Sequence, residues 1–164
     1  MSKIKTLIVD DEPLARRGLA VRLEEFDEIE VIKLCNSGQE AIDACHAEQI
    51  DLVFLDIQMP GMNGFEVARA LSESVRALPA IVFVTAFDQF AVKAFEIHAL
   101  DYILKPVDDN RLKQAVEKVH TYLKTQQDNA HKKKLASFVA GITGNNCEEI
   151  LKKLATGDTL SDKR

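Results

Sequence analysis

Short, uninterrupted apolar runs alternate with helical patterns along residues 1–124, and this alternation restricts the fold more than any other feature. A strand that is apolar at every position is buried on both faces, which is typical of parallel sheets covered by helices on both sides. Right-handed crossovers between such strands predict a doubly wound α/β fold, a five-stranded parallel sheet with five helices. The predicted strands are residues 5–9, 30–35, 52–55, 80–84 and 102–104.

Turn-forming and capping residues mark where the five helices begin. Pro13 suits the first turn of the first helix, because its missing N–H costs little there. Asp88 is expected to cap the fourth helix with its side chain. The remaining helices are expected to begin at Asn36–Gly38, Asn63–Gly64 and Asp108–Asn110.

Several polar residues stand at the carboxyl ends of the predicted strands. In an open parallel sheet, ligands bind beyond these ends, near the point where the strand order reverses. Three carboxylates and one ammonium at that edge suit a divalent metal ion and a phosphoryl group. The sequence therefore points to signalling rather than to metabolism. The residues are Asp10, Asp11, Asp56, Thr85 and Lys105.

These residues lie within motifs that resemble the receiver domain of two-component response regulators. The resemblance covers residues 4–124 and implies the flavodoxin-like receiver fold. The segment from Phe87 to Pro106 is most similar to regulators of the LytTR (LytR/AlgR) class. The motifs are Asp10-Asp11-Glu12, Asp56 followed by Met59-Pro60-Gly61-Met62-Asn63-Gly64, Thr85-Ala86 and Lys105-Pro106.

The resemblance implies a role for each residue of the site. Asp56 would be the nucleophile that becomes an aspartyl phosphate. Mg²⁺ would be held by Asp10, Asp11, Asp56 and the backbone carbonyl of Gln58. Lys105, which would precede a cis peptide bond to Pro106, would pair with one phosphoryl oxygen, and the Thr85 hydroxyl with another. Tyr102 would act as a switch with Thr85, its ring turning inward as Thr85 moves toward the phosphoryl group.

The resemblance also implies partners. The phosphoryl group would come from a sensor histidine kinase, and the domain would catalyse only its own phosphorylation and dephosphorylation. The apolar excess around Phe90, Phe95, Ile97 and Leu100 favours a homodimer through the face of the fourth helix and fifth strand. DNA would be bound only through a LytTR-type output domain, which this sequence does not contain.

Composition and the last forty residues complete the prediction. The net charge of −5 gives no electrostatic case for nucleic-acid binding by the chain itself. Three cysteines without a metal-binding spacing fit reduced thiols in a cytoplasmic protein. No apolar run approaches the ~18 residues that a membrane span needs. Residues 1–124 are expected to form the receiver, and residues 125–164 a partly flexible linker or helical tail with two short amphipathic helices.

Three other readings stay open from the sequence. The chain could be a natural single-domain regulator that acts by protein contact. It could be a phosphohydrolase of the haloacid dehalogenase type, although Gln58 stands where that class usually carries a second aspartate. It could also be a pseudo-receiver that binds partners without phosphorylation, against which the complete set of site residues argues.

Overall fold

The computed structural model describes residues 2–143, which contain one five-stranded parallel sheet with the order β2-β1-β3-β4-β5. The order reverses between β1 and β3, so the crevice expected to bind ligands lies beyond the carboxyl ends of these two strands. Each predicted strand agrees with the observed one to within one residue at either end. The strands are β1 Ile4–Val9, β2 Ile29–Cys35, β3 Leu52–Leu55, β4 Ala80–Thr85 and β5 Asp101–Leu104.

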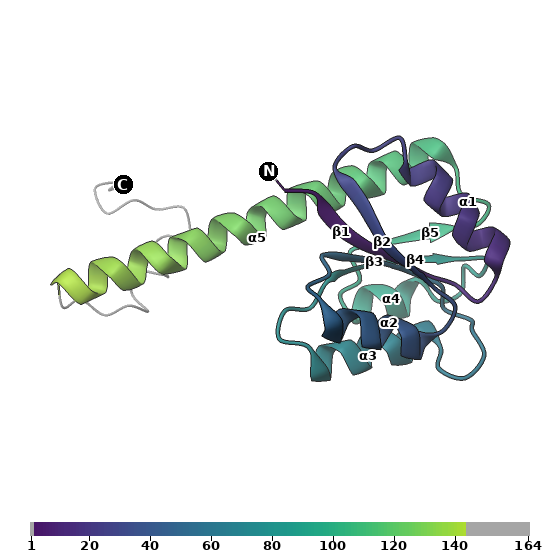
Figure 1. Ribbon diagram of the computed structural model, residues 1–164, viewed down its shortest axis with the longest axis horizontal. Coiled ribbons are helices and arrows are strands. Elements are labelled where there is room, and N and C mark those ends of the chain that lie inside the picture. Colours follow the sequence, from purple (N-terminus) through teal and green to yellow (C-terminus); the bar gives the residue numbers. More distant parts are fainter. Residues whose placement is uncertain (1, 144–164) are drawn as a thin grey trace. The chain divides into compact units, whose positions relative to one another are not determined.

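Helices cover both faces of the sheet. Figure 1 shows α1 and the part of α5 before His120 on one face, and α2, α3 and α4 on the other. All residues of β3 and β4 are buried, as the continuous apolar runs predict. The predicted doubly wound α/β fold is therefore confirmed. The helices are α1 Pro13–Leu23, α2 Gly38–Ala47, α3 Gly64–Ser74, α4 Ala91–Glu96 and α5 Asp109–Thr143.

Local sequence explains most helix starts. The Asn63 side chain accepts a hydrogen bond from the Glu66 N–H at 2.9 Å, and the Glu66 side chain accepts one from the Asn63 N–H, which forms a capping box at the start of α3. The prediction for Asp88 is wrong, because α4 begins at Ala91 and its cap residue, Phe90, makes no side-chain cap. A capping side chain must directly precede the first helical residue, and Asp88 lies too early in the loop.

The α5 helix is longer than the sequence predicts. It runs without interruption from Asp109 to Thr143, so the polar stretch 125–129 and Gly141 do not break it. Lysine, glutamine and alanine are good helix formers, and neither proline nor glycine occurs between Asp109 and Ala140. The second predicted short helix and Cys147 lie outside the described residues. The described residues divide into two compact units, one up to Val119 and one that begins at His120.

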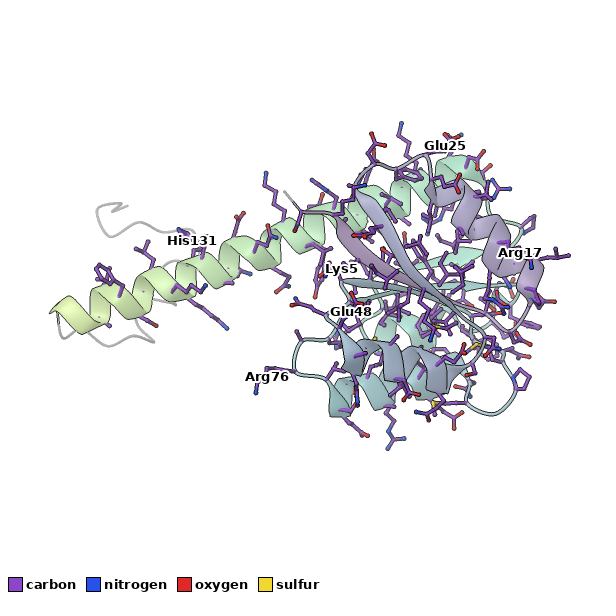
Figure 2. All side chains as sticks on the ribbon, in the orientation of Figure 1. Lys5, Arg17, Glu25, Glu48, Arg76 and His131 are labelled. Atoms are coloured by element: carbon purple, nitrogen blue, oxygen red, sulfur yellow. The ribbon has the colours of Figure 1, made fainter. Side chains whose placement is uncertain are left out.

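The surface of the described chain is charged. Arg17, Glu25 and Arg76 are exposed and point away from the core, as Figure 2 shows. Within residues 2–143, no helix is both long and apolar enough to cross a membrane. The two described cysteines, Cys35 and Cys45, are free, and burial raises the pKa of each thiol to about 11. They are packing residues rather than reactive thiols.

Candidate functional site

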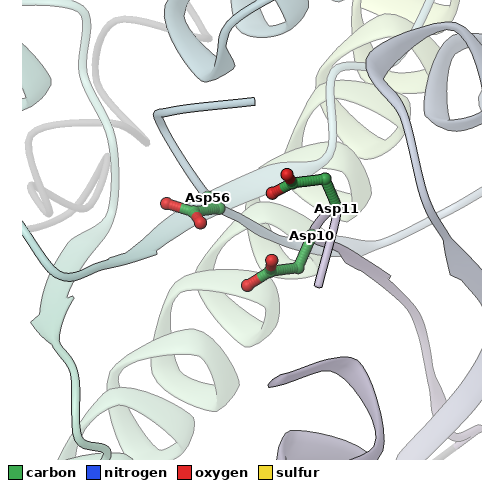
Figure 3. Close-up of side chains that lie close together, drawn as sticks. All are labelled: Asp10, Asp11 and Asp56. Atoms are coloured by element: carbon green, nitrogen blue, oxygen red, sulfur yellow. The ribbon is translucent and has the colours of Figure 1, made fainter. Parts of the chain in front are cut away.

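Three carboxylates meet at the point where the strand order reverses. Asp10 follows the last residue of β1, and Asp56 follows the last residue of β3. One oxygen from each of Asp10, Asp11 and Asp56 lies within 4.8 Å of the others, and Figure 3 shows the three side chains turned toward one space. Asp10 and Asp56 are only 5% and 7% exposed, so two of the charges are largely removed from water.

Lys105 joins the carboxylates from the end of β5. Its Nζ donates to Asp10 Oδ2 at 2.7 Å and to Asp56 Oδ2 at 3.2 Å, and lies 3.8 Å from Glu12 Oε1. The peptide bond from Lys105 to Pro106 is cis, as the resemblance implies. The predicted convergence of three carboxylates and one ammonium is therefore present at this edge of the sheet.

The electrostatics of the site follow from burial and close charges. Burial raises the pKa of the Asp56 carboxyl, and the negative charge of Asp10 adds to this rise, while Lys105 opposes it. Burial alone lowers the pKa of Lys105, but its hydrogen bonds to Asp10 and Asp56 and their charges outweigh that effect, so its pKa is raised. Lys105 thus stays charged, while burial and the Asp10 charge disfavour the ionised form of Asp56.

The backbone around Asp56 is held tightly. The Asp56 N–H donates to the Val9 carbonyl at 3.0 Å, and Asp56 Oδ1 accepts from the Ile57 N–H at 2.7 Å. Gly64 closes the loop by donating to the Ile57 carbonyl at 2.8 Å. A Cβ atom on Gly64 would lie 2.5 Å from the Asp56 carbonyl oxygen, so this close approach requires glycine. Gln58 is an exposed residue of the same loop.

The predicted switch pair stands on β4 and β5. Thr85 is fully buried, and its Oγ1 accepts a hydrogen bond from the Phe87 N–H at 3.4 Å. The Tyr102 hydroxyl donates to the Phe87 carbonyl, and its ring lies 6.4 Å from that of Phe83. The resemblance implies a Tyr102 ring that turns inward on phosphorylation, and this remains a prediction. In this structure the ring is buried, with its hydroxyl bonded to the Phe87 carbonyl and its ring packed near Phe83.

Sequence reasoning missed one residue that shapes the site. Arg16 Nη1 donates to the Asp10 carbonyl oxygen at 2.6 Å, and Asp10 Oδ1 accepts from the Glu12 N–H at 2.9 Å. These bonds fix the turn that presents Asp10 and Asp11. The sequence does show an arginine in the first helical turn after the acidic pair, which could have indicated a contact with Asp10. Arginines are common at such positions, so the pattern is not specific.

The site has the ligand chemistry of a magnesium centre. Carboxylate oxygens are the ligands that Mg²⁺ prefers, and Asp10, Asp11 and Asp56 supply one each within a small space. The buried ammonium of Lys105 beside them can pair with an anionic oxygen. The arrangement can therefore accept a phosphoryl group on a carboxylate whose charge is offset by a metal ion and a lysine.

Comparison with known proteins agrees with this chemistry. The family model described as "Response regulator receiver domain" matches residues 6–117. The chain is 50% identical over 116 residues to the transcriptional regulatory protein BtsR of Escherichia coli, covering 71% of this chain and 48% of that protein. It is 44% identical over 128 residues to the sensory transduction protein LytT of Bacillus cereus, covering 78% and 52%.

A solved structure supports the fold. The response regulatory domain of mrkE from Klebsiella pneumoniae superposes with a TM-score of 0.68 at 33% identity, covering 74% of this chain and 98% of that one. The chain spans about half the length of the curated relatives it matches. The predicted resemblance to receivers of the LytTR class is confirmed. The chain belongs to the response regulator receiver family, which consists of two-component signalling domains rather than conventional enzymes.

Proposed function

We propose that this receiver is a phosphorylation-dependent switch that takes a phosphoryl group from its cognate histidine kinase onto Asp56. A carboxylate oxygen of Asp56 attacks phosphorus, and the bond from phosphorus to the kinase imidazole breaks as the new P–O bond forms. Lys105 pairs with one phosphoryl oxygen, and the Thr85 hydroxyl donates to another. Asp10, Asp11, Asp56 and the Gln58 carbonyl would hold Mg²⁺, which would neutralise the carboxylates and the incoming group.

One observation carries this proposal. Asp56 is a buried carboxylate of the three-aspartate cluster that lies 3.2 Å from Lys105, at the end of a strand next to the point of reversal. Asp10 shares the cluster and the lysine, but it is also held by the Glu12 N–H and is closer to Lys105, at 2.7 Å. Asp56 also accepts a backbone N–H, from Ile57 at 2.7 Å, so the two carboxylates differ mainly in the longer contact of Asp56 with Lys105. This looser pairing, together with the Met59–Gly64 motif that follows Asp56, favours Asp56 as the nucleophile.

The proposal extends to the output. BtsR is named a transcriptional regulatory protein, and this chain covers 48% of its length. We assign residues 1–124 to the receiver and residues 125–164 to a linker. In the full-length protein, this linker would lead to a LytTR-type DNA-binding domain that carries the effect on transcription.

Intact-mass measurement tests the phosphoryl acceptor. Incubation with acetyl phosphate and Mg²⁺ should add ~80 Da, the mass of one phosphoryl group, and EDTA should abolish the gain. The variant Asp56→Asn should show no gain. Asp88→Asn, which removes an exposed carboxylate from a nearby loop, is the matched control and should behave as the wild type. The same gain in Asp56→Asn would refute the assignment.

A second receiver is the proposed partner at the face of α4 and β5. Phe95 and Val92 on α4 are 56% and 72% exposed, and Leu104 on β5 is 46% exposed. Phe90, by contrast, packs against Phe65 at 6.0 Å and belongs partly to the core. An exposed apolar patch beside the switch pair suits a reversible contact between two copies.

Sedimentation velocity with and without beryllofluoride tests this contact. Beryllofluoride with Mg²⁺ should increase the dimer fraction of the wild type, and Phe95→Ser should suppress that increase. Leu14→Ser removes an exposed apolar side chain from α1 and should leave it unchanged. If the wild type remains monomeric in both states at high micromolar concentration, this face serves another contact.

A further inference from the structure

Asp101, the first residue of β5, is only 2% exposed and lies outside the acidic cluster. Arg111 Nη1 donates to its Oδ2 at 2.9 Å, and Nη2 donates to its Oδ1 at 2.6 Å. The same carboxylate accepts from the Tyr102 N–H at 2.8 Å and lies 3.5 Å from Lys118 Nζ. Burial raises the pKa of Asp101, but these hydrogen bonds and positive charges outweigh burial and lower it, so the group is an ionised, fully paired anchor.

Arg111 also binds the backbone of the next residue. Its Nη2 donates to the Tyr102 carbonyl oxygen at 2.9 Å. One planar guanidinium therefore holds the side chain of Asp101 and the main chain of Tyr102, a fork geometry that a lysine ammonium cannot reproduce. Arg111 itself stands in the first turn of α5, where its N–H donates to Asp108 Oδ2 at 3.0 Å.

The strand that Arg111 holds also carries the groups of the site. The Tyr102 hydroxyl is bonded to the Phe87 carbonyl, and Lys105 follows the last residue of β5. The Lys105 N–H donates to the Thr85 carbonyl at 2.8 Å, so the end of β5 and the end of β4 are tied together. A four-residue strand thus joins the acidic edge at one end to the start of α5 at the other.

We propose that Arg111 is a positioning residue that couples the switch residue Tyr102 to α5. The coupling rests on the proposed phosphoryl transfer to Asp56, and it adds the route by which that event reaches α5. If the Tyr102 main chain shifts, its carbonyl oxygen moves relative to the Arg111 guanidinium that donates to it. Arg111 belongs to the first turn of α5, so the shift reaches that turn. Lys118 pairs with the same Asp101 carboxylate further along the helix, so more than one turn of α5 responds. In the described part of the chain, the Arg111 guanidinium bonds to Asp101 and to the Tyr102 carbonyl and not to Asp56, so the chemistry itself should not depend on it.

Hydrogen exchange of the whole 164-residue chain, followed by mass spectrometry, tests the coupling. Beryllofluoride with Mg²⁺ should change exchange over residues 110–119 of the wild type by about threefold or more, because local opening free energies set exchange rates. Arg111→Lys keeps the charge and loses the fork. It should lose most of this response, while its phosphorylation by acetyl phosphate stays within about twofold of wild type. Lys113→Gln, which removes an exposed cation from the same helix, should match the wild type in both measurements.

Asp101→Asn is the second variant, since it keeps the shape of the side chain while weakening the pair with Arg111. Its exchange response should fall as that of Arg111→Lys does. A full response in both variants overturns the coupling, and so does a wild type that is phosphorylated without any change in α5. A phosphorylation loss as large as the exchange loss also overturns it, because Arg111 would then act on the site itself. A wild type that gains no mass at Asp56 overturns the proposed function, and the coupling with it.

Discussion

Replacing Asp56 by asparagine should stabilise the metal-free protein at neutral pH, although it removes the proposed acceptor. The ligand oxygens of Asp10 and Asp11 lie within 4.8 Å of that of Asp56, and each repels it by about 3.5 kcal/mol at an effective dielectric constant of 20. Lys105 at 3.2 Å attracts it by about 5 kcal/mol on the same basis. The two repulsions exceed the attraction by about 2 kcal/mol, which disfavours the ionised form of Asp56. Burial disfavours the same form.

The pH dependence of this effect follows from the raised pKa of Asp56. A carboxyl whose pKa is raised by folding favours the folded state while protonated, and this contribution is lost as pH rises through the folded pKa. Asp56→Asn removes the cost of the charged form, so its advantage should be largest at neutral pH. The advantage should shrink as pH falls and Asp56 of the wild type takes up its proton.

Thermal unfolding in EDTA at pH 7 measures the gain. We expect Asp56→Asn to add about 1–3 kcal/mol, a rise in Tm of roughly 3–10 °C for a chain of this size. Mg²⁺ at ten times its Kd should stabilise the wild type by about 1.4 kcal/mol and the variant by much less. Asp27→Asn removes an exposed charge from the opposite edge of the sheet and should change neither value. An Asp56→Asn protein no more stable than wild type in EDTA would refute the reasoning.

Five further substitutions test the backbone geometry and the Asp101 ion pair. Gly64→Ala should lower the free energy of unfolding in urea by about 2–3 kcal/mol, because its Cβ would meet the Asp56 carbonyl oxygen at 2.5 Å. Gly18→Ala should instead raise it by about 1 kcal/mol, because Gly18 lies in the interior of α1 and its Cβ would have nothing within 4 Å. Equal values for the two variants would contradict the geometry. His98→Gly should stabilise by about 0.5–1 kcal/mol, because His98 has a φ of 66° at the end of α4, whereas His98→Ala should bring no such gain. Asp101→Asn should destabilise by about 2 kcal/mol at pH 7. Folding lowers the pKa of Asp101, so its charged form stabilises the wild type at neutral pH, and this stabilisation is lost as pH falls through the lowered pKa. The difference in stability between wild type and Asp101→Asn should therefore shrink in acid. A difference that does not depend on pH would count against the ion pair.

Much of the fold and of the site could be predicted because the signals are local. Continuous apolar runs identify strands buried on both faces, and β3 matches its prediction residue for residue. The parallel arrangement then brings every strand end to one edge, so Asp10, Asp56 and Lys105 had to meet there once the strands were correct. No knowledge of side-chain contacts was needed for this step.

Features that depend on distant contacts could not be predicted in this way. The start of α4 depends on a loop that Tyr102 holds through the Phe87 carbonyl, 15 residues away in the sequence. The length of α5 does not follow from apolar periodicity, because residues 125–129 carry no apolar stripe and yet good helix formers continue the helix through them. The role of Arg111 was missed because a single arginine at the start of a helix has no distinctive pattern.

The position of β5 in the sheet gives a physical reason why a switch should act through it. As the last strand in the order, β5 pairs only with β4, over four residues, so it can shift at a lower cost than a central strand. Both its ends are nevertheless fixed by charge, through Lys105 on the acidic cluster and through Asp101 on Arg111. In the proposed function, a phosphoryl group on Asp56 would pair with Lys105 and weaken the contact between Lys105 and Asp10 at the carboxyl end of β5. In the proposed coupling, β5 would move as one unit and so transmit this change to Asp101 at its other end, because all four of its residues pair with β4.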